Sequence, residues 1–205
     1  MAAIADRKAI RYARTALILI LLAGLVGCGH RQGSWKLMNV SGLLPSLAFD
    51  LTDSANDRVV HADAFKGRIV LLYFGYTHCP DVCPTTLAEL GRAVRDLGPK
   101  ADQVRILFVT VDPRRDSLSV LKSYAKGFGP QMVGLRGDTE ALVALTKRYR
   151  VSYGYGKPDA NGNYAVSHSS AVYVFDRQGK ARLLGKPTNH VADYAHDLKE
   201  LVAEP

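Results

Sequence analysis

The sequence predicts an α/β sandwich built on a central mixed sheet, with extra strands at its N-terminal end and a closing C-terminal helix. Three observations support this fold class. Strand-like and helix-like segments alternate through the middle of the chain, two apolar runs suit central buried strands, and a hairpin and a helix follow in the last third. With 205 residues, 47% of them hydrophobic, we expect one core and one domain.

The first half of this domain is predicted as two short strands followed by a strand–helix–strand unit. The strands are expected at 47–51, 58–61, 69–76 and 104–111, and the helix from about residue 84 to 97. Pro84 stands in the first turn of that helix, where proline is tolerated, and Gly98-Pro99 ends it. The unbroken apolar run at 69–76 indicates a strand that is buried on both faces.

The second half is predicted as helices over 117–128, 139–150 and 191–203 and strands over 132–135, 171–175 and 181–184. Asp138 is a plausible N-cap for the second helix. The short strand at 132–135 is expected at the edge of the sheet. A polar turn at 158–163 and a tight hairpin turn at 177–180 complete the pattern.

The N-terminus has the pattern of an export signal. A basic segment that ends at Arg14 is followed by the apolar run 16–26, which is short for a membrane-spanning helix of about 20 residues. Leu25-Val26-Gly27-Cys28 resembles a lipobox, in which the cysteine becomes lipidated after cleavage; an uncleaved signal anchor is the alternative. We expect a signal peptide at 1–27, a lipid-anchored tether at 28–44 and the folded domain at 45–205.

This N-terminal pattern predicts a location in the cell envelope, on the periplasmic face, with the domain held to a membrane by Cys28. The pattern does not distinguish the inner from the outer membrane. The formal net charge of the chain is +8, and its basic residues after the leader are scattered among acidic ones. That distribution indicates a solvated mixed surface rather than a nucleic-acid interface. No feature of the sequence marks a dimer interface.

Cys79 and Cys83 are the most specific chemical feature of the chain. They stand four residues apart in the segment YFGYTHCPDVCP at 73–84, between an apolar strand and a helix. A loop closed by so few residues constrains the unfolded chain little, so a structural disulfide there would stabilise weakly. The pair is therefore interpreted as functional: it can bind a soft metal, with Cu(I) and Zn as candidates, form a disulfide, or do both.

A histidine would complete such a metal site, because a third ligand is needed to hold Cu(II) as well as Cu(I). His168 is the leading candidate, since it directly precedes the predicted strand 171–175. The alternative for His168 is a ring bonded to neighbouring backbone. His78 adjoins Cys79, but the chain direction is expected to turn its ring away. The remaining histidines are interpreted as surface residues: His30, His61, His190 and His196.

Three motifs together resemble the Sco/SenC family. They are the segment 73–84, the segment VTVDPRRD at 109–116 and Ser167-His168-Ser169. The resemblance implies a thioredoxin-like fold and one copper ion, as Cu(I) or Cu(II), held by Cys79, Cys83 and His168. It also implies a role in assembling the binuclear copper centre of cytochrome c oxidase, with subunit II or another copper-site protein as partner. Asp112 is then expected near the metal, orienting or tuning a ligand.

Two other activities fit the cysteine pair. A thiol–disulfide oxidoreductase that reduces the cysteines of the oxidase copper subunit would use Cys79 and Cys83 as its redox pair. Against a generic thioredoxin, three residues separate the cysteines here instead of two, and His168 stands where thioredoxins place a cis-proline. A thiol peroxidase is disfavoured because the expected proline-threonine-cysteine loop is absent from the sequence. Asp81 is either a charge for partner docking or a solvated loop carboxylate.

Overall fold

The computed structural model describes residues 35–205, which fold around an eight-stranded sheet in the order β1-β10-β9-β4-β5-β6-β2-β3. Its strands are β1 (Met38–Asn39), β2 (Asp50–Asp53), β3 (Arg58–His61), β4 (Ile69–Gly75), β5 (Val104–Thr110), β6 (Met132–Arg136), β9 (Val172–Phe175) and β10 (Ala181–Gly185). The strands β4, β5 and β6 are parallel, and the other pairings are antiparallel. The predicted mixed sheet is thus confirmed.

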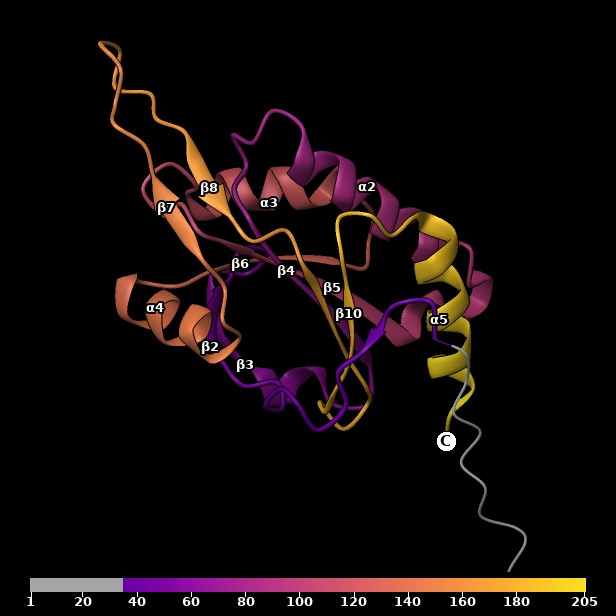
Figure 1. The fold of residues 1–205 in the computed structure, drawn as a ribbon. Coiled ribbons are helices and arrows are strands. Elements are labelled where there is room, and N and C mark those ends of the chain that lie inside the picture. The colour runs from indigo at the N-terminus through magenta and orange to yellow at the C-terminus, as the bar shows by residue number, and fades with distance from the viewer. Residues whose placement is uncertain (1–34) are drawn as a thin grey trace, which may run out of the picture. The chain divides into compact units, whose positions relative to one another are not determined.

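The helices are α2 (Val82–Arg95), α3 (Leu118–Lys126), α4 (Thr139–Arg148) and α5 (Val191–Ala203), with short 3-10 turns η2 (Ala62–Phe65) and η3 (Gly98–Gln103). Figure 1 shows α2, α3 and α5 on one side of the sheet and α4 on the other. The crossovers β4–α2–β5 and β5–α3–β6 join neighbouring parallel strands, which requires their helices to share a face. Asp138 caps α4 as predicted, since its carboxylate accepts from the Ala141 N–H.

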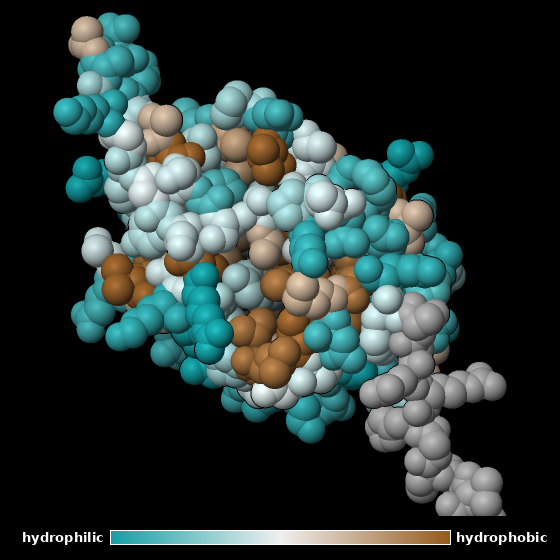
Figure 2. All heavy atoms as spheres, viewed as in Figure 1, coloured by the Kyte–Doolittle hydropathy of each residue, from teal (hydrophilic) through white to brown (hydrophobic). Residues whose placement is uncertain are grey.

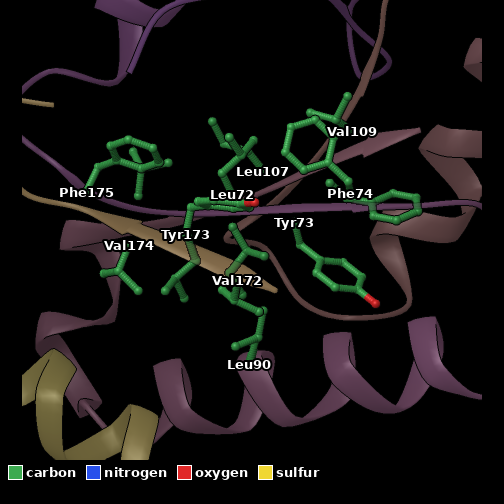
Figure 3. Close-up of a cluster of buried hydrophobic side chains, with 14 of the residues drawn as sticks. Leu72, Tyr73, Phe74, Leu90, Leu107, Val109, Val172, Tyr173, Val174 and Phe175 are labelled. Carbon is green, nitrogen blue, oxygen red and sulfur yellow. The ribbon is translucent and has the colours of Figure 1, made fainter. Parts of the chain in front are cut away.

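The core lies on both faces of the two central parallel strands. Every residue of β4 is buried, and β5 is buried except at Arg105. Successive side chains of a strand point to opposite faces, so Tyr73 faces α2 while Phe74 faces the other layer. Figure 3 shows these two rings on opposite sides of the strand, with Leu90 of α2 beneath. Burial on both faces explains why the apolar run in this segment is unbroken.

Two expectations from the sequence are wrong. The strand β6 is not at an edge, because β2 pairs with its free side and β3 then forms the edge. Residues 35–44 do not belong to a tether: β1 pairs with β10, and Leu37 and Val40 are buried. The backbone N–H groups of Lys36 and Leu37 donate to the buried Asp197 carboxylate on α5, which fixes the start of the domain.

A second, two-stranded sheet was not expected from the sequence. It pairs β7 (Tyr153–Tyr155) with β8 (Val166–His168) and projects from the body of the domain (Figure 1). The tip of this hairpin is largely hydrophilic (Figure 2), and it contains the polar turn predicted at 158–163. The predicted loop around His168 is therefore partly a strand. Within the described residues, no helix has the length and apolar character needed to span a membrane.

Candidate metal centre

Strand pairing brings the two halves of the candidate site together. The strand β9 lies antiparallel to β4, with Val172 opposite Tyr73 near the carboxyl end of β4. The chain that leads into β9 therefore meets the chain that leaves β4. The first segment carries His168 at the end of β8, and the second carries Cys79 before α2 and Cys83 in its first turn.

Cys79, Cys83 and His168 form the one group of potential metal ligands in the described part of the chain, with their donor atoms all within 4.8 Å of one another. The Nε2 atom of His168 lies 3.2 Å from the Cys83 sulfur. The backbone N–H of Cys83 donates to the Cys79 sulfur over 3.4 Å, as the free N–H groups at the start of a helix can. The three residues that the sequence analysis selected are thus neighbours in space.

His168 presents a neutral ring nitrogen to the sulfurs. Burial lowers the pKa of its imidazole below the ordinary value of 6.5, so the ring is neutral at pH 7. Its Nδ1 atom lies 3.1 Å from the Ser169 carbonyl oxygen, which can only accept a hydrogen bond. The proton therefore sits on Nδ1, and the Nε2 lone pair is directed to the site. In metal-binding histidines in general, the ring nitrogen that does not bind the metal donates a hydrogen bond, and this bond fixes the tautomer.

The two thiols differ in their environments. Cys83 is fully buried, and this burial raises its pKa from 9.0 to about 12. Cys79 is half-buried; burial also raises the pKa of its thiol, but hydrogen bonds from the backbone of Asp81 and Cys83 and from side chains outweigh that effect and lower it. Cys79 is thus the more acidic and more accessible sulfur, and Cys83 is the deeper one.

Gly75 is required at this site, and the sequence analysis did not identify it. A Cβ atom on Gly75 would lie 2.9 Å from the Cys83 sulfur and 2.8 Å from the Phe108 ring. Any side chain here would therefore displace the thiol or the core beneath it. A glycine at the end of a buried strand indicates such a close approach, which was the available signal.

A buried carboxylate, Asp116, holds the start of the cysteine loop. It accepts hydrogen bonds from the Thr77 N–H over 3.0 Å, from the Thr77 hydroxyl over 2.6 Å and from the Thr110 hydroxyl over 2.6 Å. Asp116 is completely buried, so these donors replace water around its charge. It ties the loop after β4 to the end of β5. The sequence analysis included Asp116 in a motif without assigning it this role.

Asp112 does not belong to the cluster of potential ligands among the described residues. Its carboxylate accepts from Arg115 Nε and, over 2.7 Å, from the Tyr164 hydroxyl. The Arg115 guanidinium stacks 3.8 Å from the Tyr164 ring centroid and faces Tyr76, whose ring packs edge-on against His168. The expected influence of Asp112 on the metal would run through these side chains and stays a prediction.

The other candidate residues lie apart from this cluster. His78 is exposed, and its Nδ1 contacts the Thr77 hydroxyl and approaches Asp116. His61 pairs with Asp50 on the surface, His190 precedes α5, and His196 contacts Asp197. Asp81 is exposed at the start of α2, and its carboxylate contacts the Thr85 hydroxyl. Cys28 and His30 lie outside the described residues.

The sequence model of the SCO1/SenC family matches residues 45–203 of this chain. The bovine (Bos taurus) mitochondrial SCO2 homologue is 41% identical over 133 residues, which are 64% of this chain and 50% of the bovine protein. An SCO2-like protein of Rickettsia felis is 38% identical over 133 residues, which are 64% of each protein. This chain therefore spans between half and two thirds of the length of these relatives.

Solved structures of Sco proteins are also similar to this chain. The copper-bound structure of ScoI from Bradyrhizobium japonicum is 36% identical and has a TM-score of 0.69, covering 76% of this chain and 98% of its own. The copper-bound structure of yeast Sco1 is 30% identical with a TM-score of 0.69, covering 78% of this chain and 91% of its own. The predicted thioredoxin-like fold is confirmed by this likeness.

Proposed function

This chain belongs to the SCO1/SenC family, and from that premise we propose that it is a copper metallochaperone. In this proposal Cys79, Cys83 and His168 bind one copper ion, which is cargo, and a copper-site protein receives it. The observation that carries the proposal is the convergence of two sulfurs and one imidazole nitrogen within 4.8 Å. The family resemblance names cytochrome c oxidase subunit II as the recipient.

The donor chemistry fits copper. Thiolates and imidazole are ligands that suit Cu(I), and adding the imidazole to the two sulfurs makes a site that Cu(II) also accepts. The His168 Nε2 lone pair is free and its ring neutral, so this ligand needs no proton loss at pH 7. Both thiols must lose their protons to bind, and the metal itself drives that loss at Cys83.

The two sulfurs have different roles in transfer. The half-buried Cys79 is the position at which the thiolate of a partner can approach the bound ion, whereas Cys83 is completely enclosed. Stepwise exchange would therefore begin with release of the Cys79 sulfur, while Cys83 and His168 retain the ion until a second new bond forms. Cys79 is thus the ligand that is exchanged first, and Cys83 and His168 are the ligands that retain the ion.

Titrations of the reduced protein with Cu(I) and with Cu(II), each in competition with a chelator of known affinity, test the proposal. We expect one ion per chain, and an affinity for Cu(II) at least about tenfold weaker in His168→Ala, because a ligand bond is lost. His78→Ala is the matched control, since His78 is a neighbouring histidine outside the cluster. Undiminished Cu(II) affinity in His168→Ala would contradict the proposed ligand set.

A thiol–disulfide oxidoreductase is the second candidate function. The observation that favours it is the difference between the thiols, because an accessible sulfur of lowered pKa beside a buried one suits nucleophilic attack and resolution. Loss of His168 separates the two functions: reduction of a protein disulfide would survive it, and copper delivery would not.

The proposal also includes the location of the protein, with the domain held by lipidated Cys28 on the periplasmic face of a membrane.

Deletion of the gene tests the partner. We expect reduced cytochrome c oxidase activity, restored by the unaltered gene and not by a Cys83→Ser version. Recovery with the His168→Ala version would favour the oxidoreductase over the copper carrier.

A further inference from the structure

Tyr73 has a buried hydroxyl that the fold leaves without a partner. Its side chain is completely buried, and among the described residues no group lies at hydrogen-bonding distance and geometry from its oxygen. A buried polar group without a partner destabilises the fold, because it has given up its hydrogen bonds to water. Phenylalanine would fill the same space without that cost, so the hydroxyl requires an explanation.

The location of this hydroxyl provides one. Tyr73 lies on β4, and Figure 3 shows its hydroxyl directed toward α2, the helix that carries Cys83 in its first turn. A Cβ atom placed on Gly75 would meet the Cys83 sulfur at 2.9 Å and the Tyr73 ring carbon Cε1 at 3.3 Å. The tyrosine ring and the sulfur therefore border the same small space. The Tyr73 ring also packs in a T-shaped arrangement against His168, with 6.0 Å between ring centroids.

Two polar side chains lie near the Tyr73 hydroxyl, the Cys83 thiol and the Thr86 hydroxyl, but neither meets it with hydrogen-bonding geometry. The phenol is completely buried and keeps its proton at neutral pH, so it remains a donor. A neutral thiol is a weak acceptor, which is consistent with the unpartnered hydroxyl.

We propose that Tyr73 is a positioning residue for the Cys83 sulfur: its O–H donates a hydrogen bond to that sulfur whenever the sulfur is anionic. Two states meet that condition. One is the copper thiolate, and this part rests on the proposed function. The other is the thiolate released when a Cys79–Cys83 disulfide is reduced, and this part requires no metal.

Burial decides the course of that reduction. An external thiolate can reach the half-buried Cys79 sulfur but not the enclosed Cys83 sulfur. Its attack forms a mixed disulfide with Cys79, breaks the bond between the two protein sulfurs and leaves the electron pair on Cys83. A second external thiol then releases Cys79, so two small thiols become one disulfide while the protein gains two electrons and two protons. Cys83 is the leaving group, and leaving thiolates depart faster when stabilised.

Tyr73→Phe is the test variant, and Tyr124→Phe is the matched control. The Tyr124 hydroxyl is likewise buried and unpartnered, and the rings of Tyr73 and Tyr124 both pack against Phe108. The metal-free measurement is the rate at which dithiothreitol reduces the oxidised protein. Since hydrogen bonds to charged groups are the stronger class, we expect Tyr73→Phe to be reduced about tenfold more slowly or worse, and Tyr124→Phe to match the unaltered protein.

The second measurement is the sulfur-to-Cu(II) charge-transfer spectrum of the loaded protein. We expect the band to shift in Tyr73→Phe alone, because hydrogen bonding tunes a copper-bound thiolate. An unchanged reduction rate together with an unchanged band would overturn the inference. Failure of Tyr73→Phe to fold would also overturn it, by revealing a structural partner for the hydroxyl. If the unaltered protein shows no charge-transfer band while the rates differ, thiolate binding of Cu(II) fails and the role of Tyr73 in reduction remains.

Discussion

The middle of the strands β4 and β5 and the carboxyl end of the same strands are built in different ways. In the middle, Leu71, Leu72 and Leu107 are buried among other apolar side chains and make no polar contact. At the carboxyl end, Thr110, Asp112 and Asp116 are just as completely buried but polar. Burial in the first region stabilises the fold without direction, while burial in the second is tolerated only because each oxygen has particular donors.

This difference separates what holds the domain together from what positions the candidate metal site. Apolar packing accepts many side chains of similar volume, and it fixes no single atom. A buried carboxylate with several donors fixes those donors relative to each other and is costly when one is removed. We therefore expect mutations in the middle of the strands to lower stability alone, and mutations at their carboxyl end to lower stability and disturb the geometry of the site.

The largest effect is expected from Leu72→Ala in the middle of β4. Leu72 is fully buried, so the loss of its side chain removes apolar contacts and leaves a cavity, at a cost of about 2–5 kcal/mol in the free energy of unfolding. Chemical denaturation measures this loss. The folded fraction should keep its copper affinity, and the exposed Val143→Ala is the control. A loss of copper affinity as large as the loss of stability would erase the distinction between the regions.

A smaller loss of stability, accompanied by a defect at the site, is expected from Asp116→Ala. The change leaves the Thr77 N–H and the Thr77 and Thr110 hydroxyls without their acceptor, at a cost of about 1–3 kcal/mol. The loop that leads to Cys79 is then released, so Cu(I) affinity should fall as well. Denaturation and copper competition measure the two effects, with the exposed Asp63→Ala as control. A folded variant with full copper affinity would show that this anchor is structural alone.

The smallest effect on folding stability is expected from pH, with no mutation, and here the measured quantity is copper affinity. The pKa of Cys83 is about 12, well above neutral, so binding a metal to this sulfur displaces a proton. Copper affinity should therefore rise with pH, by about tenfold per unit for each proton released. His168 adds no dependence near pH 7 because its pKa is lowered, and it reduces affinity only in acid. Competition titrations between pH 6 and 8 measure the slope, and a flat profile would contradict a buried thiol as ligand.

The sequence by itself determined most of the elements and the identity of the candidate ligands. The continuous apolar runs of β4 and β5 have the short length of buried strands rather than of helices. Pro84 and Asp138 mark helix starts by their local backbone chemistry. The spacing of Cys79 and Cys83 is a local fact, so it is readable from the chain. The position of His168 directly before the predicted strand 171–175 made it the leading candidate among six histidines, and the likeness of three separated motifs to one family implied the same residue.

Only the tertiary structure decided the relations between distant segments. The position of β6 inside the sheet depends on its pairing with β2, and the inclusion of residues 35–44 depends on β10 and Asp197, none of which a local pattern encodes. The same holds for Gly75, Tyr73 and Asp116, whose roles arise from atoms that lie against them in space. Periodicity reports which face of an element is buried, but not which partner covers it, because hydrophobic burial is non-directional.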